Sequence, residues 1–278
     1  MAEHPPTSNP TPWAEGRPTK TDVDMECDDD DSGLVGISAF SDTASITSSI
    51  VKYRVENGRT YHAYKAGSYI LPNDDRENDR LDQQHHLALL TLDDQLFIAP
   101  VDKDKMKRVL DAGCGSIRDW PKFFEQAYQN LSPGGFIELM DPIYPVTSDD
   151  ETVSKDSAVY KWSSLMNEAA TKMGSGLDSA LRYKEQLIEA GFVNVVETPY
   201  KWPMNTWPQD RKTKELGAWG NVNLVGGAQG LSLALFTKVL GWSHAQLEVF
   251  LVDVRKDLCD KNLHGYWRVN VVYGQKPE

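Results

Sequence analysis

The spacing of apolar side chains divides the chain into alternating helices and short strands. A stripe at three- and four-residue intervals predicts a helix from Trp120 to Leu131, and Pro121 stands in its first turn, where proline is tolerated. Similar stripes predict helices over 77–92, 159–173, 177–188, 231–240 and 247–258. Ser243 and Gln246 form a capping-box pattern that marks the start of the last of these helices.

Short apolar runs bounded by turn residues predict four strands, at 109–113, 136–141, 192–198 and 265–274. The first of them precedes the helix at 120–131, and the second follows it. This order predicts a parallel crossover and therefore an α/β sheet.

Two further segments are less regular in their pattern. The tryptophan-rich segment 202–219 predicts an irregular loop or short helix that covers a pocket or the core, with packing as the default role of its tryptophans. The glycine-rich segment 223–230 is interpreted as the lead-in to a helix, because no Lys-Ser or Lys-Thr follows it to make a phosphate-binding loop.

The first 47 residues differ from the rest in composition. They are rich in Pro, Ser, Thr and Asp, include the acidic run Asp28–Asp31, and show almost no apolar periodicity. We therefore expect a disordered acidic tail at 1–47 and one folded domain at 48–278. The tail is interpreted as a solvated charge run, with docking to a basic partner as the alternative.

Charge and cysteine content exclude several classes of protein. The chain has 29 Lys and Arg against 41 Asp and Glu, a net charge of -12, which argues against direct binding to nucleic acid or to an anionic membrane. Its three cysteines are widely spaced and odd in number, which favours a reducing compartment over a disulfide framework. No stretch has the roughly 20 apolar residues of a membrane span. We expect an intracellular protein, cytoplasmic or nuclear.

The segment Arg108–Gly115 carries the strongest sign of a ligand site. In an open α/β sheet, nucleotide-like ligands lie beyond the carboxyl end of a strand. Gly113 and Gly115 would let the backbone approach such a ligand, and Asp111 would bond within the turn or to the polar end of the ligand. A strand followed by two glycines also occurs as a simple turn, so this signal is weak by itself.

Adjacent histidines at 85 and 86 raise the question of a metal site. On a helix, His85 and His86 point about 100° apart and cannot both face one ion. No cysteine or carboxylate nearby supplies ligand spacing, so packing or hydrogen bonding is favoured and no metal site is predicted.

Three stretches together resemble the fungal LaeA-like methyltransferases. They are the block Glu56–Arg59 with Tyr61-His62 and Leu71–Asp74, the turn Val109–Gly115, and Asp119–Pro121 with Pro133–Gly135. The resemblance covers roughly 48–274. It implies a Rossmann-like class I methyltransferase fold that binds S-adenosylmethionine at Asp111, Gly113 and Gly115.

The resemblance also implies other properties of the site and its partners. Methyl transfer is an in-line displacement that needs mainly positioning and desolvation, so no catalytic residue is named. Tyr61, Tyr69, His85 and His86 are candidate substrate-pocket residues by their place in the motif-rich segment, with packing as the alternative. For some family members the resemblance suggests a complex with velvet-type regulatory proteins. The methyl acceptor cannot be inferred.

This chain departs from the family pattern after Gly115. In the family, the glycine turn continues into a helix, a strand that ends in an acidic residue for the ribose, and strands that carry the adenine pocket. Here Ser116 follows at once, so the fold is expected to be truncated by about 60 to 80 residues, or two to three βα units. Two functions therefore remain open: a methyltransferase with weakened donor binding, and a non-catalytic regulatory protein derived from one.

Overall fold

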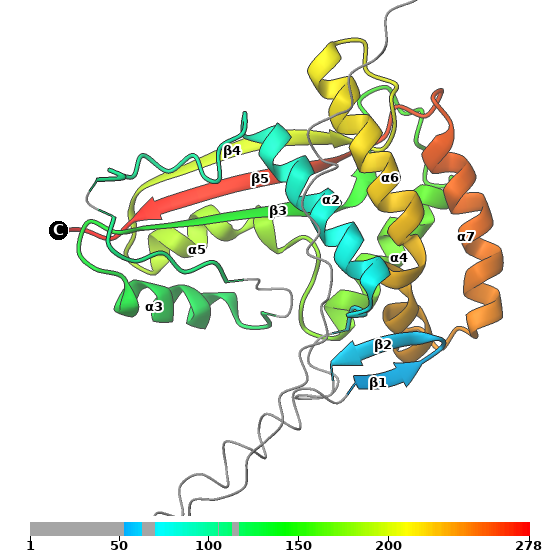
Figure 1. Ribbon diagram of the computed structural model, residues 1–278, viewed down its shortest axis with the longest axis horizontal. Helices are drawn as coiled ribbons and strands as arrows, with labels where there is room; N and C mark the ends of the chain where they lie inside the picture. Colours follow the sequence, from blue (N-terminus) through cyan, green and yellow to red (C-terminus); the bar gives the residue numbers. More distant parts are fainter. Residues whose placement is uncertain (1–52, 63–69, 105, 113–116) are drawn as a thin grey trace, which may run out of the picture. The chain divides into compact units, whose positions relative to one another are not determined.

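An antiparallel sheet of three strands organises the fold (Figure 1). The computed structural model describes residues 53–62, 70–104, 106–112 and 117–278. The strands lie in the order β3 (Phe136–Thr147), β5 (Tyr266–Gln275) and β4 (Val193–Pro203). β5 is the central strand: Val272 pairs with Leu139 of β3, and Val271 pairs with Thr198 of β4.

Helices cover both faces of this sheet. One face packs against α3 (Trp120–Asn130), α5 (Tyr183–Glu189) and the short 3-10 turn η1 (Ser179–Leu181). The other packs against α2 (Asp75–Thr91) and α6 (Arg211–Ala234). The buried side chains Phe124, Leu187 and Val272 occupy the first interface, and Leu87, Leu216 and Val269 occupy the second.

A third core lies where the helices extend beyond the strand ends. There α4 (Ala158–Lys172), α6 and α7 (His244–Cys259) pack together with the π-helical turn η2 (Leu235–Val239). Trp162 is fully buried, and its indole Nε1 donates to Ser232 Oγ at 2.7 Å. The predicted capping box at Ser243 and Gln246 is confirmed at the start of α7.

A small hairpin lies near the start of the described chain. β1 (Tyr53–Glu56) and β2 (Arg59–His62) pair in antiparallel fashion around Asn57 and Gly58, whose φ angles are 51° and 75°. Both angles are in the left-handed region, as the tight hairpin turn favoured by Asn-Gly requires.

The predicted strand at 109–113 and the parallel crossover are wrong. Residues 106–112 form no strand, and Val109 and Leu110 are 70% and 87% exposed. Only these two large apolar residues stand between the charged Arg108 and Asp111. A strand buried between two helical layers needs a longer apolar run. The mixed α/β class is confirmed, with an antiparallel sheet in the part described.

Two other expectations also need correction. The segment 202–219 is an irregular loop only at 204–210, because β4 continues to Pro203 and the long helix α6 begins at Arg211. The glycine-rich segment 223–230 is not a helix lead-in, since it lies in the middle of the 24-residue α6. Its glycines allow close packing of other segments against the helix: a Cβ on Gly227 would lie 2.4 Å from Cδ of Arg80, and a Cβ on Gly230 would lie 3.0 Å from Nη1 of Arg59.

No helix in the described part of the chain is long and apolar enough to cross a membrane. The expected acidic tail at 1–47 falls outside the described residues. The tail and the intracellular location stay predictions.

Gly226 and Gly227 provide a matched test of why α6 carries glycines. A Cβ on Gly227 would lie 2.4 Å from Cδ of Arg80, whereas a Cβ on Gly226 would meet nothing within 4 Å. We expect Gly227→Ala to lower the free energy of unfolding by about 1–3 kcal/mol, because Arg80 must move. Gly226→Ala should raise it by about 0.5–1 kcal/mol, because alanine is the better helix former. Urea denaturation measures both, and equal effects would contradict this account.

Candidate functional site

The segment predicted to bind the cofactor lies at the surface. Asp111 is exposed, and Gly113 and Gly115 lie outside the described residues. The two hollows that stand out have volumes of about 420 Å³ and about 70 Å³, and Asp111 lines neither of them. The role of these three residues stays a prediction.

The candidate substrate residues do not form one pocket. Tyr61 is 2% exposed, with the guanidinium of Arg54 5.8 Å and the ammonium of Lys238 5.6 Å from its ring centre. Burial raises the pKa of its hydroxyl. It lines the 70 Å³ hollow, which is far smaller than the roughly 300 Å³ at which ligand pockets begin.

The histidines diverge as the helical spacing predicts. His85 is exposed on α2, while His86 packs edge-on against Trp219 of α6, with ring centres 4.4 Å apart. Tyr69 lies outside the described residues. No group of three or more His, Cys, Asp or Glu in the described part could hold a metal ion.

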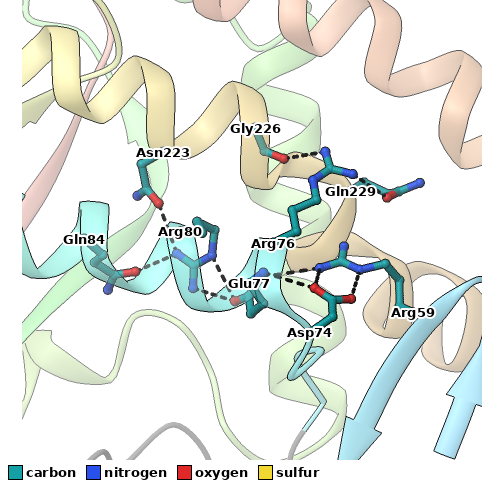
Figure 2. Close-up of polar contacts among 9 residues, drawn as sticks. All are labelled: Arg59, Asp74, Arg76, Glu77, Arg80, Gln84, Asn223, Gly226 and Gln229. Atoms are coloured by element: carbon teal, nitrogen blue, oxygen red, sulfur yellow. Dashed lines mark hydrogen bonds and ion pairs between the residues drawn. The ribbon is translucent and has the colours of Figure 1, made fainter. Parts of the chain in front are cut away.

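The motif-rich segment instead builds a buried polar network between α2, α6 and the hairpin (Figure 2). It starts at Asp74, the N-cap of α2. The Oδ1 of Asp74 accepts a 3.0 Å hydrogen bond from the backbone amide of Glu77. The same carboxylate binds the guanidinium of Arg59 through two hydrogen bonds, one of them 2.7 Å from Nη2 to Oδ1. The Arg59 guanidinium lowers the pKa of Asp74. The cap of α2 is thereby tied to strand β2.

Arg80 forms the second part of this network. Its Nε and Nη2 both donate to Glu77 Oε1, at 2.9 Å and 2.7 Å. Its Nη1 donates to Gln84 at 2.7 Å and to Asn223 of α6 at 3.2 Å. Glu77 and Arg80 are only 2% and 6% exposed, so water cannot solvate their charges. Each side chain instead compensates the charge of the other.

Arg76 extends the contacts along α6 toward α7 (Figure 2). Its Nη2 donates to the carbonyl of Gly226 at 2.8 Å. Further along α6, Gln229 Nε2 donates to Glu248 Oε1 of α7 at 2.6 Å. Each of these guanidinium groups is already bonded to protein. The network therefore holds α2 and the hairpin against α6 and presents no free cation to a ligand.

A largely buried carboxyl group lies on β3, in a residue that is partly exposed as a whole. Asp141 accepts a 2.9 Å hydrogen bond from the Tyr183 hydroxyl, and the Tyr183 ring packs 4.6 Å from that of Trp120. Burial raises the pKa of Asp141 to about 6, which the Tyr183 hydrogen bond partly offsets. Its cross-strand neighbour Asn270 is fully buried, and among the described residues the Oδ1 atom of Asn270 has no hydrogen-bond partner. Sequence reasoning missed Asp141, although an acidic residue at the end of an apolar strand is a usable signal.

Glu138 on β3 anchors the chain that follows α2. Its carboxylate accepts the backbone amides of Ile98 and Ala99, the shortest at 2.7 Å. Burial raises the pKa of Glu138, and the two amides act in the opposite direction. This contact holds 98–99 to the sheet through a side chain.

Three relatives show where the chain belongs. It is 30% identical to the methyltransferase pytC of Aspergillus terreus over 322 positions, which cover 94% of this chain and 97% of pytC. The chain belongs to the LaeA-like methyltransferase family. It is also 43% identical to the probable methyltransferase tdiE of Emericella nidulans over 57% of this chain and 50% of tdiE. Its identity to the secondary metabolism regulator LAE1 of Cochliobolus heterostrophus is 26%, over 81% of this chain and 95% of LAE1.

The family assignment of this chain rests on its individual relatives and not on a family profile. No known family profile matches it. The alignment with pytC is longer than the 278 residues of the chain, so pytC has residues without a counterpart here.

The raised pKa of Asp141 leads to a pH-dependent stability. Ionisation of a carboxyl whose folded pKa of about 6 exceeds its ordinary value of 3.8 is disfavoured in the folded state, so stability should fall as pH rises from about 4 to 6. Asp141→Asn removes this loss. We expect the variant to gain up to about 3 kcal/mol over the parent at pH 8, and less than about 1 kcal/mol at pH 4, in thermal denaturation. A gain of equal size at both pH values would contradict the assignment, and Asp119→Asn at an exposed cap is the control.

Proposed function

We propose that this chain derives from a methyltransferase that uses S-adenosylmethionine, and that in its 278-residue form it does not hold that donor. The relatives named as methyltransferases imply a methyl donor, and the turn at Asp111 resembles the one that binds S-adenosylmethionine. The observation that carries the proposal is the exposure of Val109 and Leu110, at 70% and 87%. The strand that should present the turn is not formed.

The residues present do not fit an adenosyl group. Such a ligand needs a crevice beyond a strand, a carboxylate for its ribose and an apolar pocket for its purine. Asp111 stands on an exposed segment without a strand, and it lines neither the 420 Å³ hollow nor the 70 Å³ hollow. Loss of the ribose and purine contacts, at about 1–3 kcal/mol each, would weaken binding by several powers of ten.

The length of the pytC alignment supports a missing segment. We place it between Gly115 and Ser116, where the glycine turn meets Asp119–Pro121 directly. The segment would supply the strands that normally separate the turn from β3.

Donor binding is tested by thermal denaturation with S-adenosylmethionine. A donor at 100 times its dissociation constant stabilises a protein by about 2.7 kcal/mol, which raises the melting temperature by about 5–10 °C at this size. We expect no shift for this chain at millimolar donor. We expect a shift for a variant that carries the unmatched segment of pytC between Gly115 and Ser116.

The matched control places a Gly-Ser linker of the same length at the same junction. It should show no shift, because length alone does not supply the pocket. A saturable shift in the chain as it stands would overturn the proposal.

A second candidate function is non-catalytic regulation. It is favoured by the three buried cores and the polar network, which form among described residues outside the glycine turn. LAE1 is named as a regulator of secondary metabolism. We propose velvet-type proteins as partners, in keeping with the family resemblance.

The two functions are separated by complementation in a strain that lacks the gene. If the role is non-catalytic, the chain as it stands should restore the metabolite profile as well as the variant with the inserted segment, as judged by chromatography of culture extracts. Restoration only by the inserted variant would reject this second candidate.

A further inference from the structure

The free edge of β3 is the most unusual surface of the sheet. Among the described residues, β3 and β4 are both edge strands, since each pairs only with β5. A long unpaired strand edge is a template for another strand, and proteins usually blunt such edges with proline, bulges or charge. The two edges differ in this respect.

The prolines establish which backbone groups point outward. A proline has no N–H to give to a ladder, so Pro142 on β3 and Pro199 on β4 occupy positions that face away from β5. The two assignments are consistent with each other. The prolines pair with Val269 and Asn270, which are consecutive on β5 and therefore direct their backbone groups to opposite neighbouring strands. On β3, the alternating pattern then directs the amides of 136, 138 and 140 outward.

β4 is blunted in the middle of its edge. Pro199 removes the central outward donor, and the register shifts between Val193 and Val196, as at a bulge. β3 has its two prolines, Pro142 and Pro145, and its register shift between Ile143 and Thr147 in its second half, so the stretch from Phe136 to Asp141 is free of both. The amides of Glu138 and Met140 make no backbone hydrogen bond outside the sheet in the described part of the chain.

The edge of β3 is also reachable. Every residue from Phe136 to Pro142 is partly exposed, whereas Val269, Val271 and Val272 of the central strand are fully buried. The nearby residues 98–99 are held by the Glu138 side chain and leave the strand backbone unpaired.

We propose that this edge pairs with the same edge of a second copy of the chain, antiparallel about a twofold axis at Leu139. In this register, Glu138 and Met140 of one copy exchange hydrogen bonds with Met140 and Glu138 of the other. The amide of Phe136 in one copy donates to the carbonyl of Pro142 in the other. The N–H that proline lacks is at the end of this ladder. The edge is thus self-complementary, which favours a second copy over an unrelated strand.

The inference rests on the proposed function in one respect: the proposed missing segment explains why the edge of β3 is open. The inserted segment would cover β3, so the variant that carries it should remain a monomer. Because the tests below use no donor, dimerisation and donor binding can fail independently.

The register is tested by disulfide trapping. Leu139 faces Leu139 of the other copy at a non-hydrogen-bonded position, where Cα atoms lie about 4.5 Å apart, within disulfide range. In a background with Cys27, Cys114 and Cys259 replaced by serine, Leu139→Cys should form a covalent dimer under mild oxidation. Ile137→Cys, two residues away on the same face, should not, because it lies opposite Asp141. Equal trapping of both variants, or of neither, would overturn the proposal.

A second measurement follows the mass in solution by light scattering. We expect the mass of the parent to double between low and high micromolar concentration. Met140→Pro removes an outward donor while the β5 ladder is retained, so the doubling should be lost. Met140→Leu keeps the donor and should behave as the parent. A parent that stays monomeric throughout this range would contradict the inference even if Met140→Pro failed to fold.

Discussion

β5 hydrogen-bonds to both other strands, so the sheet exists only while this last strand is in place. Its partners are far away in sequence: Gln275 pairs with Phe136 on one side and with Val193 on the other. On this strand the buried Val269 packs into the layer of α2 and α6 and the buried Val272 packs into the layer of α3 and α5, so β5 joins the helical layers on both faces. The fold is thus a set of long-range pairings around one central strand.

The helical cover on one face depends on charge as well as on apolar packing. Arg80 and Arg59 approach α6 at Gly227 and Gly230, where a Cβ would crowd their side chains. A buried arginine is tolerated only when its partners are fixed, and Glu77 and Asp74 supply them from the first turn of α2. The glycines of α6 and the acidic residues of α2 therefore act together: the glycines leave space for the two arginines, the carboxylates bind them, and both fix how α2 packs on α6.

Much of this arrangement could be predicted from the sequence, and the exceptions have physical causes. The stripes of α3, α4 and α7 and the capping box at Ser243 were sufficient because helix packing and caps are local. The Asn57-Gly58 hairpin had an equally local signal that went unused. The site was less predictable: the partners of Arg80 come from α2 and α6, and a glycine-rich helix centre does not reveal which side chain fills its groove.

The failed strand at 109–113 and the open edge of β3 follow from the same constraint. A strand is stable only when its backbone groups are paired and its side chains suit both faces it meets. At 109–112 the charged neighbours of Val109 and Leu110 would enter apolar layers, so this segment does not serve as a further neighbour of β3. The three-stranded sheet is stable without such a neighbour because its pairings close around β5. A donor crevice needs strands on both sides of the glycine turn, so under the proposed truncation it is the first feature to be lost.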